Sequence, residues 1–435
     1  MTKRNWLWVF VVAFLGWGVL AGWLMSIDLE KKATAEILAQ YPDRGLPRIN
    51  IELDGVSLEE INEGLKETKY EGNELTLYDG ADISSFEDVE VKGRGNSTWT
   101  QPKKPYQIKF KRGVDLLGMG KNKKWVFLAN YLDVSSIRND VAMILAEMLG
   151  EEYNVRGEFV ELYFGGEYEG VYYVLPRIEI AKNSVGLREP DGVLFELDTL
   201  HMAEGDCHWS YWGDCLRLKG VVSGERESEQ AAMEFVEDFR KLEMAAEQGN
   251  YDEVMDLIDV DSFVKYFLIN EFTVNPDAYT SSFYLYKDGT EDKIHAGPVW
   301  DFDFALGNHN WSWQVDESFF SPEEEMVRKK EVFSEDSDAT VGISKLFYHL
   351  DEMPEFKKEI VRIFGEKMSG RGGEFVKKIL ATIDKVGEAL KADNEKWETG
   401  DFENETRSLM DWILKRYEFF ERLYGDGKYA KRVFL

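Results

Sequence analysis

The sequence GPVWDFDFALGN, from Gly297 to Asn308, places two aspartates among tryptophan, phenylalanine, valine and leucine residues. An ionised carboxylate is costly to bury unless it is paired, hydrogen-bonded or bound to a metal ion. The two acids, Asp301 and Asp303, therefore indicate either a metal site or a local structural role. In the second interpretation, Asp301 caps a turn and Asp303 pairs with a lysine.

A further acid, Asp277, lies upstream in the segment NEFTVNPDAYTSSFYLY, which runs from residue 270 to residue 286. It ends a predicted helix-to-strand loop, and a predicted hairpin with the turn signal KDG then leads to Asp301. Because a hairpin folds back on itself, these two acids can meet at one end of it, although 24 residues separate them. Protein kinases have this order in their C-terminal lobe, where one carboxylate accepts the hydroxyl proton and another holds magnesium. The order therefore indicates phosphoryl transfer.

The first half of the chain contains a weaker nucleotide-binding signal. The turn GRGNS, residues 93–97, separates two predicted strands, and Lys109 lies on the strand that follows it. Backbone amides of a glycine-bearing loop, followed by a strand lysine, can form a cradle for phosphates. Most turns of this composition are only turns, which is the alternative interpretation.

Hydrophobic periodicity predicts an α+β fold. Short alternating segments that end in glycine or Asp-Gly signals predict strands through residues 48–180, with one amphipathic helix over about 135–149. Residues 181–435 are predicted to be mostly helical, with a catalytic segment over 262–308 that includes the hairpin. Helices are predicted over residues 227–248, 251–257, 262–272, 374–392 and 403–424. The sequence therefore predicts a β-rich N-terminal lobe followed by a mostly helical C-terminal lobe, whose last helices occupy residues 341–435.

The chain is strongly acidic. It has 435 residues, with 82 acidic against 52 basic side chains and a formal net charge of −30. An acidic surface repels phosphates, which argues against direct nucleic-acid binding. The charge suits cationic partners or metal ions, and simple solubility is the alternative interpretation.

A basic and apolar segment opens the chain. Lys3 and Arg4 precede an uncharged apolar run, Trp6 to Met25, which is long enough to span a bilayer as a helix. We expect residues 1–27 to form an uncleaved signal anchor, with residues 28–47 as a stalk. The basic flank predicts a cytoplasmic N-terminus, with the remainder membrane-anchored on the extracytoplasmic face. Cleavage of the segment, which would release a secreted protein, is the alternative.

Two cysteines, Cys207 and Cys215, lie within the local duplication GDCHWSYWGDC. Outside a membrane, a local disulfide is the first interpretation of such a pair. A metal site formed with His201 and His208 is the rival, although the spacing matches no standard zinc pattern. Two unpaired thiols are the third interpretation.

Six segments resemble, in order, the successive motifs of the spore coat protein H (CotH) kinase family. They are KGRGNSTW, KKPYQIKF, NYLDVSSIRND, GEYEGVYYVL, NPDAYTSSFYLY and GPVWDFDFALGN, and the resemblance covers about residues 48–308. It implies an atypical, two-lobed protein-kinase-like fold in a secreted or surface-associated protein. It further implies transfer of the γ-phosphate of ATP to Ser or Thr of an extracytoplasmic or coat protein, with Mg²⁺ or Mn²⁺ as cofactor.

The resemblance also implies roles for individual residues. Asp277 would be the catalytic acid, Asp301 the metal-binding aspartate, and Asp303 a second metal ligand or a structural partner. Arg94 and Lys109 are expected to contact the nucleotide phosphates.

The predicted helix over 135–149 carries two further features. Asp133, Arg138 and Asn139 match the D-x4-RN segment of the family, and a helix cap with a supporting ion pair is the interpretation we favour for them. Glu147, late in the same helix, is a candidate partner for the strand lysine, as in kinases. A solvated helix face is the interpretation we favour for this glutamate.

Two departures from the family pattern keep a catalytically inactive protein under consideration. Ser282 stands where the family has the asparagine that binds a second metal ion, and we expect Ser282 to occupy that position, with Asp303 as a possible compensation. Pro176 stands near a position that is often acidic in the family, with Glu179 slightly later. The alternative function is a pseudokinase-like surface-binding or adhesion protein that uses the aromatic residues around the cysteines. A metal-dependent hydrolase is a third interpretation.

Overall fold

The computed structural model describes residues 41–80, 82–199, 206–223, 225–279, 281–308, 321–328 and 345–425. The predicted signal anchor and most of the predicted stalk lie outside these residues. Within the described ranges, no helix is long and apolar enough to cross a membrane.

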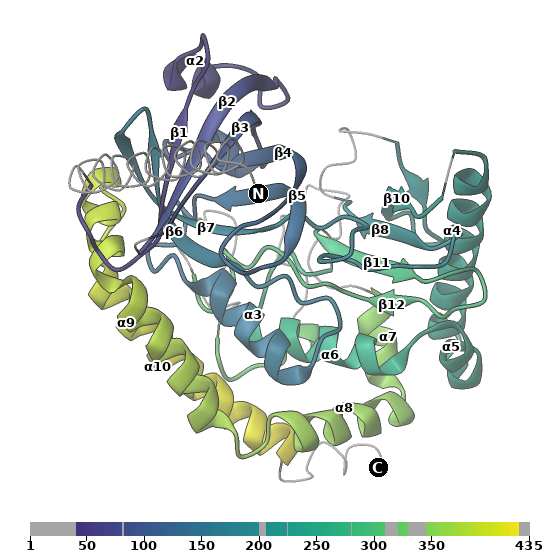
Figure 1. Ribbon diagram of the computed structural model, residues 1–435. Coiled ribbons are helices and arrows are strands. Elements are labelled where there is room, and N and C mark those ends of the chain that lie inside the picture. The colour runs from purple at the N-terminus through teal and green to yellow at the C-terminus, as the bar shows by residue number, and fades with distance from the viewer. Residues whose placement is uncertain are drawn as a thin grey trace, which may run out of the picture.

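The N-terminal half of the described chain forms a closed barrel (Figure 1). Its strands are β1 (Arg48–Glu52), β2 (Tyr70–Asp79), β3 (Asp82–Gly93), β4 (Tyr106–Asp115), β5 (Lys121–Leu128), β6 (Glu158–Phe164) and β7 (Glu167–Pro176). Neighbouring strands pair antiparallel, except that β1 and β6 run parallel and close the barrel. Alternating residues such as Ile49 and Ile51 point into a fully buried core. Closure satisfies the strand edges, so the ends of the barrel and its loops remain available for binding.

Short helical elements accompany the barrel strands. Helix α2 (Leu58–Glu63) begins with a capping box, in which Ser57 and Glu60 satisfy each other's backbone amides. A 3₁₀ turn, Ser97–Thr100, follows the glycine-bearing turn after β3.

Helix α3 (Arg138–Leu149) packs between the barrel and the helical half, and every residue in it except Glu147 is buried. The sequence predicted a start near residue 135. The helix begins later because Ser136 has a left-handed backbone, with φ of 55°, which an α-helix cannot contain. The Asp133 carboxylate accepts hydrogen bonds from the amides of Ser135 and Arg138, so it caps the first helical turn.

A second sheet lies beside the barrel. The three of its strands that come first in the chain, β8 to β10, were not predicted. Its order is β12-β11-β8-β10-β9, all antiparallel. The strands are β8 (Val193–Leu197), β9 (His208–Trp209), β10 (Cys215–Val221), β11 (Phe283–Lys287) and β12 (His295–Ala296). The second half was predicted to be mostly helical with one hairpin, and the structure adds β8, β9 and β10 to that hairpin. Strand β8 is buried along its whole length and begins with the apolar run Val193 to Phe195, which lacks the alternation that marks a half-exposed strand.

The remaining described elements are helical and surround the second sheet and α3 (Figure 1). They are α4 (Glu225–Glu247), α5 (Tyr251–Leu257), α6 (Val260–Thr273), the 3₁₀ turn Met326–Arg328, α7 (Lys345–Glu352), α8 (Pro354–Lys367), α9 (Gly372–Trp397), α10 (Phe402–Phe420) and a π-helical turn Glu421–Gly425. The α+β class, β-rich at the N-terminus and helical at the C-terminus, is confirmed. The likeness to the two-lobed kinase fold remains a prediction.

One buried ion pair ties the barrel to α9. Lys103 precedes β4, and its Nζ donates to both carboxylate oxygens of Asp393, at 2.7 and 3.0 Å, and to the carbonyl of Val171 at 2.6 Å. The amide of Val171 donates to Asp393 at 2.8 Å. Both charged side chains are almost fully buried. Such a pair fixes the position of α9 against β7, because each partner alone would be an uncompensated buried charge.

We expect Lys103→Met to lower the free energy of unfolding by about 3–5 kcal/mol, since it leaves Asp393 buried without its cation. The exposed pair Lys385–Glu158 also joins α9 to the barrel, at 2.5 Å. Lys385→Met is the matched control and should cost less than about 1 kcal/mol. Urea denaturation measures both values. Equal losses in the two variants would contradict the structural role given to the buried pair.

Candidate active site

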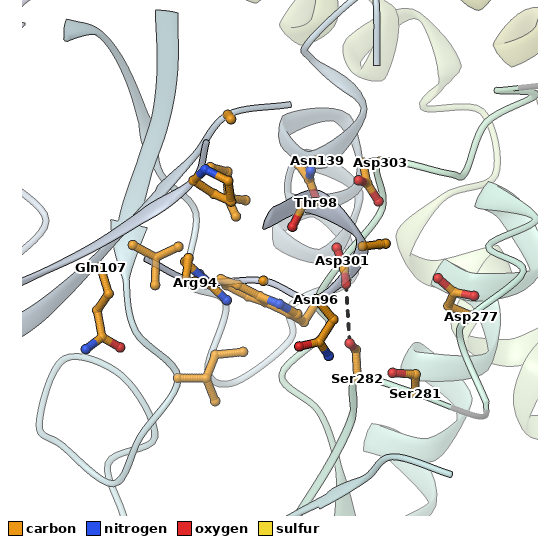
Figure 2. A pocket seen from close by; sticks show the side chains of 18 of the residues that line it. Arg94, Asn96, Thr98, Gln107, Asn139, Asp277, Ser281, Ser282, Asp301 and Asp303 are labelled. Carbon is orange, nitrogen blue, oxygen red and sulfur yellow. Dashed lines mark hydrogen bonds between the residues drawn. The ribbon is translucent and has the colours of Figure 1, made fainter. Parts of the chain in front are cut away.

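A cavity of about 770 Å³ lies where the barrel meets the second sheet. The turn after β3, the end of β5, strands β8 and β10, the loop after α6 and the segment after β12 contribute to its wall (Figure 2). Arg94, Asp277, Ser282, Asp301 and Asp303 all line it. The structure thus brings together five of the seven side chains that the sequence singled out.

Three carboxylates share one end of this cavity. Asp277 comes from the loop between α6 and β11, and Asp301 and Asp303 come from the segment after β12. Burial, followed by the negative charges of Asp301 and Asp277, raises the pKa of Asp303 well above its ordinary value. Both effects disfavour the ionised carboxylate, and a bound cation would offset the negative charges gathered here.

The backbone at this end adopts an uncommon conformation. Asp301 and Ser282 both have left-handed backbones, with φ of 68° and 56°. Their side chains face each other, and Ser282 Oγ donates to Asp301 Oδ2 at 3.5 Å (Figure 2). A left-handed conformation costs an L-residue on the order of 1–2 kcal/mol, so the surrounding structure must hold both residues in place.

The donor set fits a divalent cation that also contacts phosphate. Within the described residues, no group of three or more His, Cys, Asp or Glu side chains could by itself hold a metal ion. Mg²⁺ is commonly bound through one or two carboxylates, with phosphate oxygens and water completing its shell. Asp301 and Asp303 meet that requirement, whereas a cage made only of protein ligands is not present in the described part of the chain.

Three guanidinium groups line the cavity, and two of them, Arg94 and Arg177, come from the barrel side. Arg94 lies over the ring of Trp300, with 5.3 Å from its Cζ to the ring centroid, and its Nη1 is buried without a hydrogen-bond partner. Burial lowers the pKa of this guanidinium. The Arg177 side chain also faces the cavity and forms no ion pair with any described residue. Anionic groups of a ligand would satisfy both arginines.

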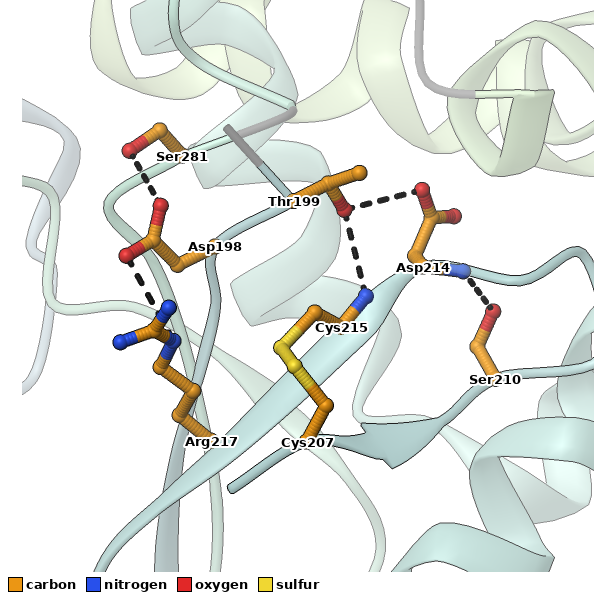
Figure 3. Close-up of a disulfide and its surroundings, with 8 residues drawn as sticks. All are labelled: Asp198, Thr199, Cys207, Ser210, Asp214, Cys215, Arg217 and Ser281. Carbon is orange, nitrogen blue, oxygen red and sulfur yellow. Dashed lines mark hydrogen bonds and ion pairs between the residues drawn. A yellow bond between two sulfur atoms is a disulfide. The ribbon is translucent and has the colours of Figure 1, made fainter. Parts of the chain in front are cut away.

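The sheet side of the cavity is lined by ion pairs between β8 and β10. Lys219 pairs with Glu196 at 2.6 Å, and Arg217 pairs with Asp198 at 3.7 Å. Ser281 donates to Asp198 at 3.0 Å, which links the loop that carries Asp277 to the sheet (Figure 3). This wall is therefore polar but locally neutralised, unlike the arginine side.

A disulfide joins Cys207 to Cys215 beside this wall (Figure 3). The predicted local disulfide is confirmed, and the rival metal site is wrong because the bond consumes both thiols. Of the histidines proposed for that site, His208 belongs to β9 and His201 lies outside the described residues. The disulfide fixes the start of β10, two residues before Arg217.

The two remaining predicted residues do not line the cavity. Lys109 lies on the same side of β4 as Gln107, which does line it, but about 7 Å further along the strand. Its Nζ pairs with Glu90 at 3.3 Å. Glu147 lies about 12 Å beyond Asn139 along α3 and pairs with Lys378 at 2.9 Å. The candidate kinase-type pair between Lys109 and Glu147 is not formed, and Glu147 lies on the exposed face of α3 that the sequence favoured.

The sequence reasoning missed several residues that line the cavity. Arg177 follows the last barrel strand in the motif VLPRIE. The prediction considered only that Pro176 replaces an acid there, and it did not consider Arg177. Glu196 and Asp198 were missed because β8 was not predicted as a strand. The alternation of acids in the segment FELD, residues 195–198, was the available signal.

Comparison with known proteins identifies the relationship. The family model described as CotH kinase protein matches residues 91–420. The chain belongs to this family. It is also similar to the inner spore coat protein H of Bacillus subtilis (strain 168), with 25% identity over 229 residues. That match covers 51% of this chain and 59% of the relative, so it spans less than two thirds of the relative's length.

The three carboxylates and both arginines all fall within the part that matches the CotH family. One further acid, Glu151, supports the segment that leads to Asp301. Glu151 follows α3, and its Oε1 accepts a hydrogen bond from the amide of Val299 at 2.8 Å, two residues before Asp301. Its Oε2 is buried without a hydrogen-bond partner in the described chain. Burial raises the pKa of Glu151 to about 7.

This pKa predicts a dependence of stability on pH. An unfolded glutamate titrates near pH ~4.3, so between that value and about 7 the folded state binds more protons than the unfolded state. The stabilising contribution of Glu151 is therefore complete below about pH 4 and is lost as the pH rises through about 7. We expect Glu151→Gln to gain about 2–3 kcal/mol relative to wild type between pH ~5 and ~8.

Urea denaturation across this pH range measures the difference in unfolding free energy. Glu395→Gln is the control, because water solvates this exposed glutamate in the folded and unfolded protein. A Glu151→Gln difference that does not change with pH would contradict the assignment.

Proposed function

We propose that this chain is a metal-dependent atypical protein kinase that transfers the γ-phosphate of ATP to a Ser or Thr hydroxyl. The observation that carries this proposal is the opposition of charges in one cavity. Asp277, Asp301 and Asp303 lie at one end, and Arg94 and Arg177 line the same space. A polyphosphate held between arginines and a carboxylate-bound cation has the charge distribution that phosphoryl transfer requires.

Each of these residues has a separate role in the proposed phosphoryl transfer. Asp277 accepts the proton of the acceptor hydroxyl as its oxygen forms a bond to the γ-phosphorus and the bond to the β-phosphate oxygen breaks. ADP leaves with the electron pair of the broken bond. Arg94 and Arg177 hold phosphate oxygens and offset their charge. A divalent cation, when bound by Asp301 and Asp303, would supply further charge neutralisation, with Ser282 as a neutral oxygen ligand beside them.

We propose a protein acceptor on the extracytoplasmic side, either a surface or a coat protein. The CotH family membership, the relative named for the inner spore coat and the apolar run from Trp6 to Met25 support this location. A disulfide is also typical of proteins outside the reducing cytoplasm. Nucleic acid is not proposed as a partner, because of the net charge of −30.

The second candidate function is a catalytically inactive surface-binding protein. Ser282 at the second-metal position and two exposed aromatics on the disulfide loop favour it. Trp209 is 47% exposed and Tyr211 is 49% exposed, and such side chains can contact a protein or a sugar. Nucleotide binding and phosphate transfer distinguish the two candidates.

We expect the purified full chain in detergent to transfer labelled γ-phosphate to itself or to a generic acceptor when Mn²⁺ or Mg²⁺ is present. Asp301→Ala should abolish transfer, and Asp277→Asn should lower its rate by about 10²–10⁴-fold, because it removes the proton acceptor. Asp411→Ala changes an exposed acid on α10 and is the control. Transfer that survives Asp301→Ala at the wild-type rate would refute the assignment.

Nucleotide binding can be measured without turnover. ATP with Mn²⁺ at about 100 times its dissociation constant should stabilise the folded protein by about 2.7 kcal/mol, which raises the melting temperature by several degrees. We expect Arg177→Gln to require at least tenfold more ATP for the same rise, because a charge-assisted contact to phosphate is lost. The melting temperature without nucleotide serves as the control for folding. No rise at millimolar nucleotide would favour the inactive binding protein.

A further inference from the structure

The peptide unit that follows Asp301 has unusual hydrogen-bond partners. Both of its polar groups, the carbonyl of Asp301 and the amide of Phe302, bond to asparagine side chains from other parts of the chain. A trans peptide directs these two groups to opposite sides, so the two asparagines hold it from both sides. The clamp falls on a residue whose backbone is left-handed, with φ of 68°.

Asn275 supplies the first half of the clamp. Its Nδ2 donates to the carbonyl of Asp301 at 3.0 Å, and its Oδ1 accepts from the amide of Asp277 at 3.3 Å. The side chain is 1% exposed. It therefore bridges the loop that bears the proposed proton acceptor and the loop that bears the proposed metal ligand.

Asn139 supplies the second half from the first turn of α3. Its Oδ1 accepts from the amide of Phe302 at 2.9 Å, and its Nδ2 donates to Asn130 Oδ1 at 3.3 Å. Asn139 is 2% exposed and lines the cavity together with Asp301 and Asp303 (Figure 2).

The neighbouring residues of the D-x4-RN segment hold Asn139 in register. Asp133 caps the amide of Arg138, and the Arg138 guanidinium donates to Asp133, to Glu405 and to the carbonyl of Ala305. Arg138 thus fixes α3 against the end of the segment that contains Asp301. The segment therefore does more than cap a helix, because it presents Asn139 to the Asp301–Phe302 peptide.

We propose that Asn139 and Asn275 are positioning residues that clamp the Asp301–Phe302 peptide and so direct the Asp301 carboxylate toward a bound divalent cation. This inference rests on the proposed function, in which Asp301 is a metal ligand. Without the clamp, the peptide can rotate and the left-handed backbone at Asp301 can relax to a more common conformation. The carboxylate then leaves its position beside Ser282.

The first test measures binding of Mn²⁺ to the full chain in detergent with ADP. The electron paramagnetic resonance signal of free Mn²⁺ reports how much of the ion remains unbound. We expect Asn139→Ala and Asn275→Ala each to weaken Mn²⁺ binding by about 10–100-fold, as is usual when a residue that orients a metal ligand is lost. Asn275→Asp keeps the acceptor for Asp277 and loses the donor to Asp301, so it should weaken binding to a similar extent.

The control is Asn394→Ala. Asn394 is similarly buried, at 5% exposure, and donates to the carbonyl of Val134 at 3.1 Å, but it does not line the cavity. Its replacement should leave the Mn²⁺ midpoint within about twofold of wild type, whatever it does to stability. Equal effects of the control and the clamp variants would overturn the positioning role.

The second test needs no ligand. Hydrogen–deuterium exchange of peptides that cover residues 299–306 reports whether the clamp holds this segment. We expect at least tenfold faster exchange in Asn139→Ala and Asn275→Ala, and no change there in Asn394→Ala. Unchanged exchange in the clamp variants would overturn the inference, even if wild type binds Mn²⁺. Failure of wild type to bind Mn²⁺, with Asp301→Ala indistinguishable from it, would instead overturn the proposed function and the metal role of the clamp, while exchange still decides whether the clamp exists.

Discussion

Electrostatic repulsion among three carboxylates is the constraint around which the rest of the cavity is arranged. Asp277, Asp301 and Asp303 come from two loops and share one end of a single space, and burial together with the charges of Asp301 and Asp277 raises the pKa of Asp303. Side chains that repel each other do not converge on their own, so the backbone must hold them together. The left-handed conformations of Asp301 and Ser282 and the asparagines that bind their loops are the structural means by which this occurs.

The barrel and the second half of the chain supply different parts of the cavity wall. The closed barrel has its strand edges paired, so its loops can carry Arg94 and Arg177 to the cavity without exposing a sheet edge. The helical half holds the acids, with α3 buried at the junction and bonded to the acid-bearing segment. The ion pair between Lys103 and Asp393 then fixes the barrel against α9. Arg94 and Arg177 thus come from the barrel and the three carboxylates from the second half of the chain, and Lys103, which anchors the barrel to α9, also lines the cavity.

Much of the acidic end could be predicted from sequence, because a hairpin is a local structure. The KDG turn and the alternation around it brought Asp277 and Asp301 within reach before any tertiary contact was known. The basic end was predicted less well. Arg94 was found from its glycine-bearing turn, but Lys109 was chosen where Arg177 faces the cavity. On β4, Gln107 lines the cavity, whereas Lys109 lies on the same face about 7 Å further along the strand and does not. Sequence patterns cannot detect a difference of two residues along one face.

The sequence by itself determined the α+β class and the family, and it indicated the local disulfide and the proximity of Asp277 to Asp301, since each depends on residues close together in the chain or on motifs read in order. Only the tertiary structure decided which bases face those acids, and that Asn139 and Asn275, 136 positions apart, hold one peptide between them. The physical reason is that hydrogen bonds between distant segments depend on packing and side-chain direction. Neither leaves a periodic signal in the sequence, whereas burial and turn formation do.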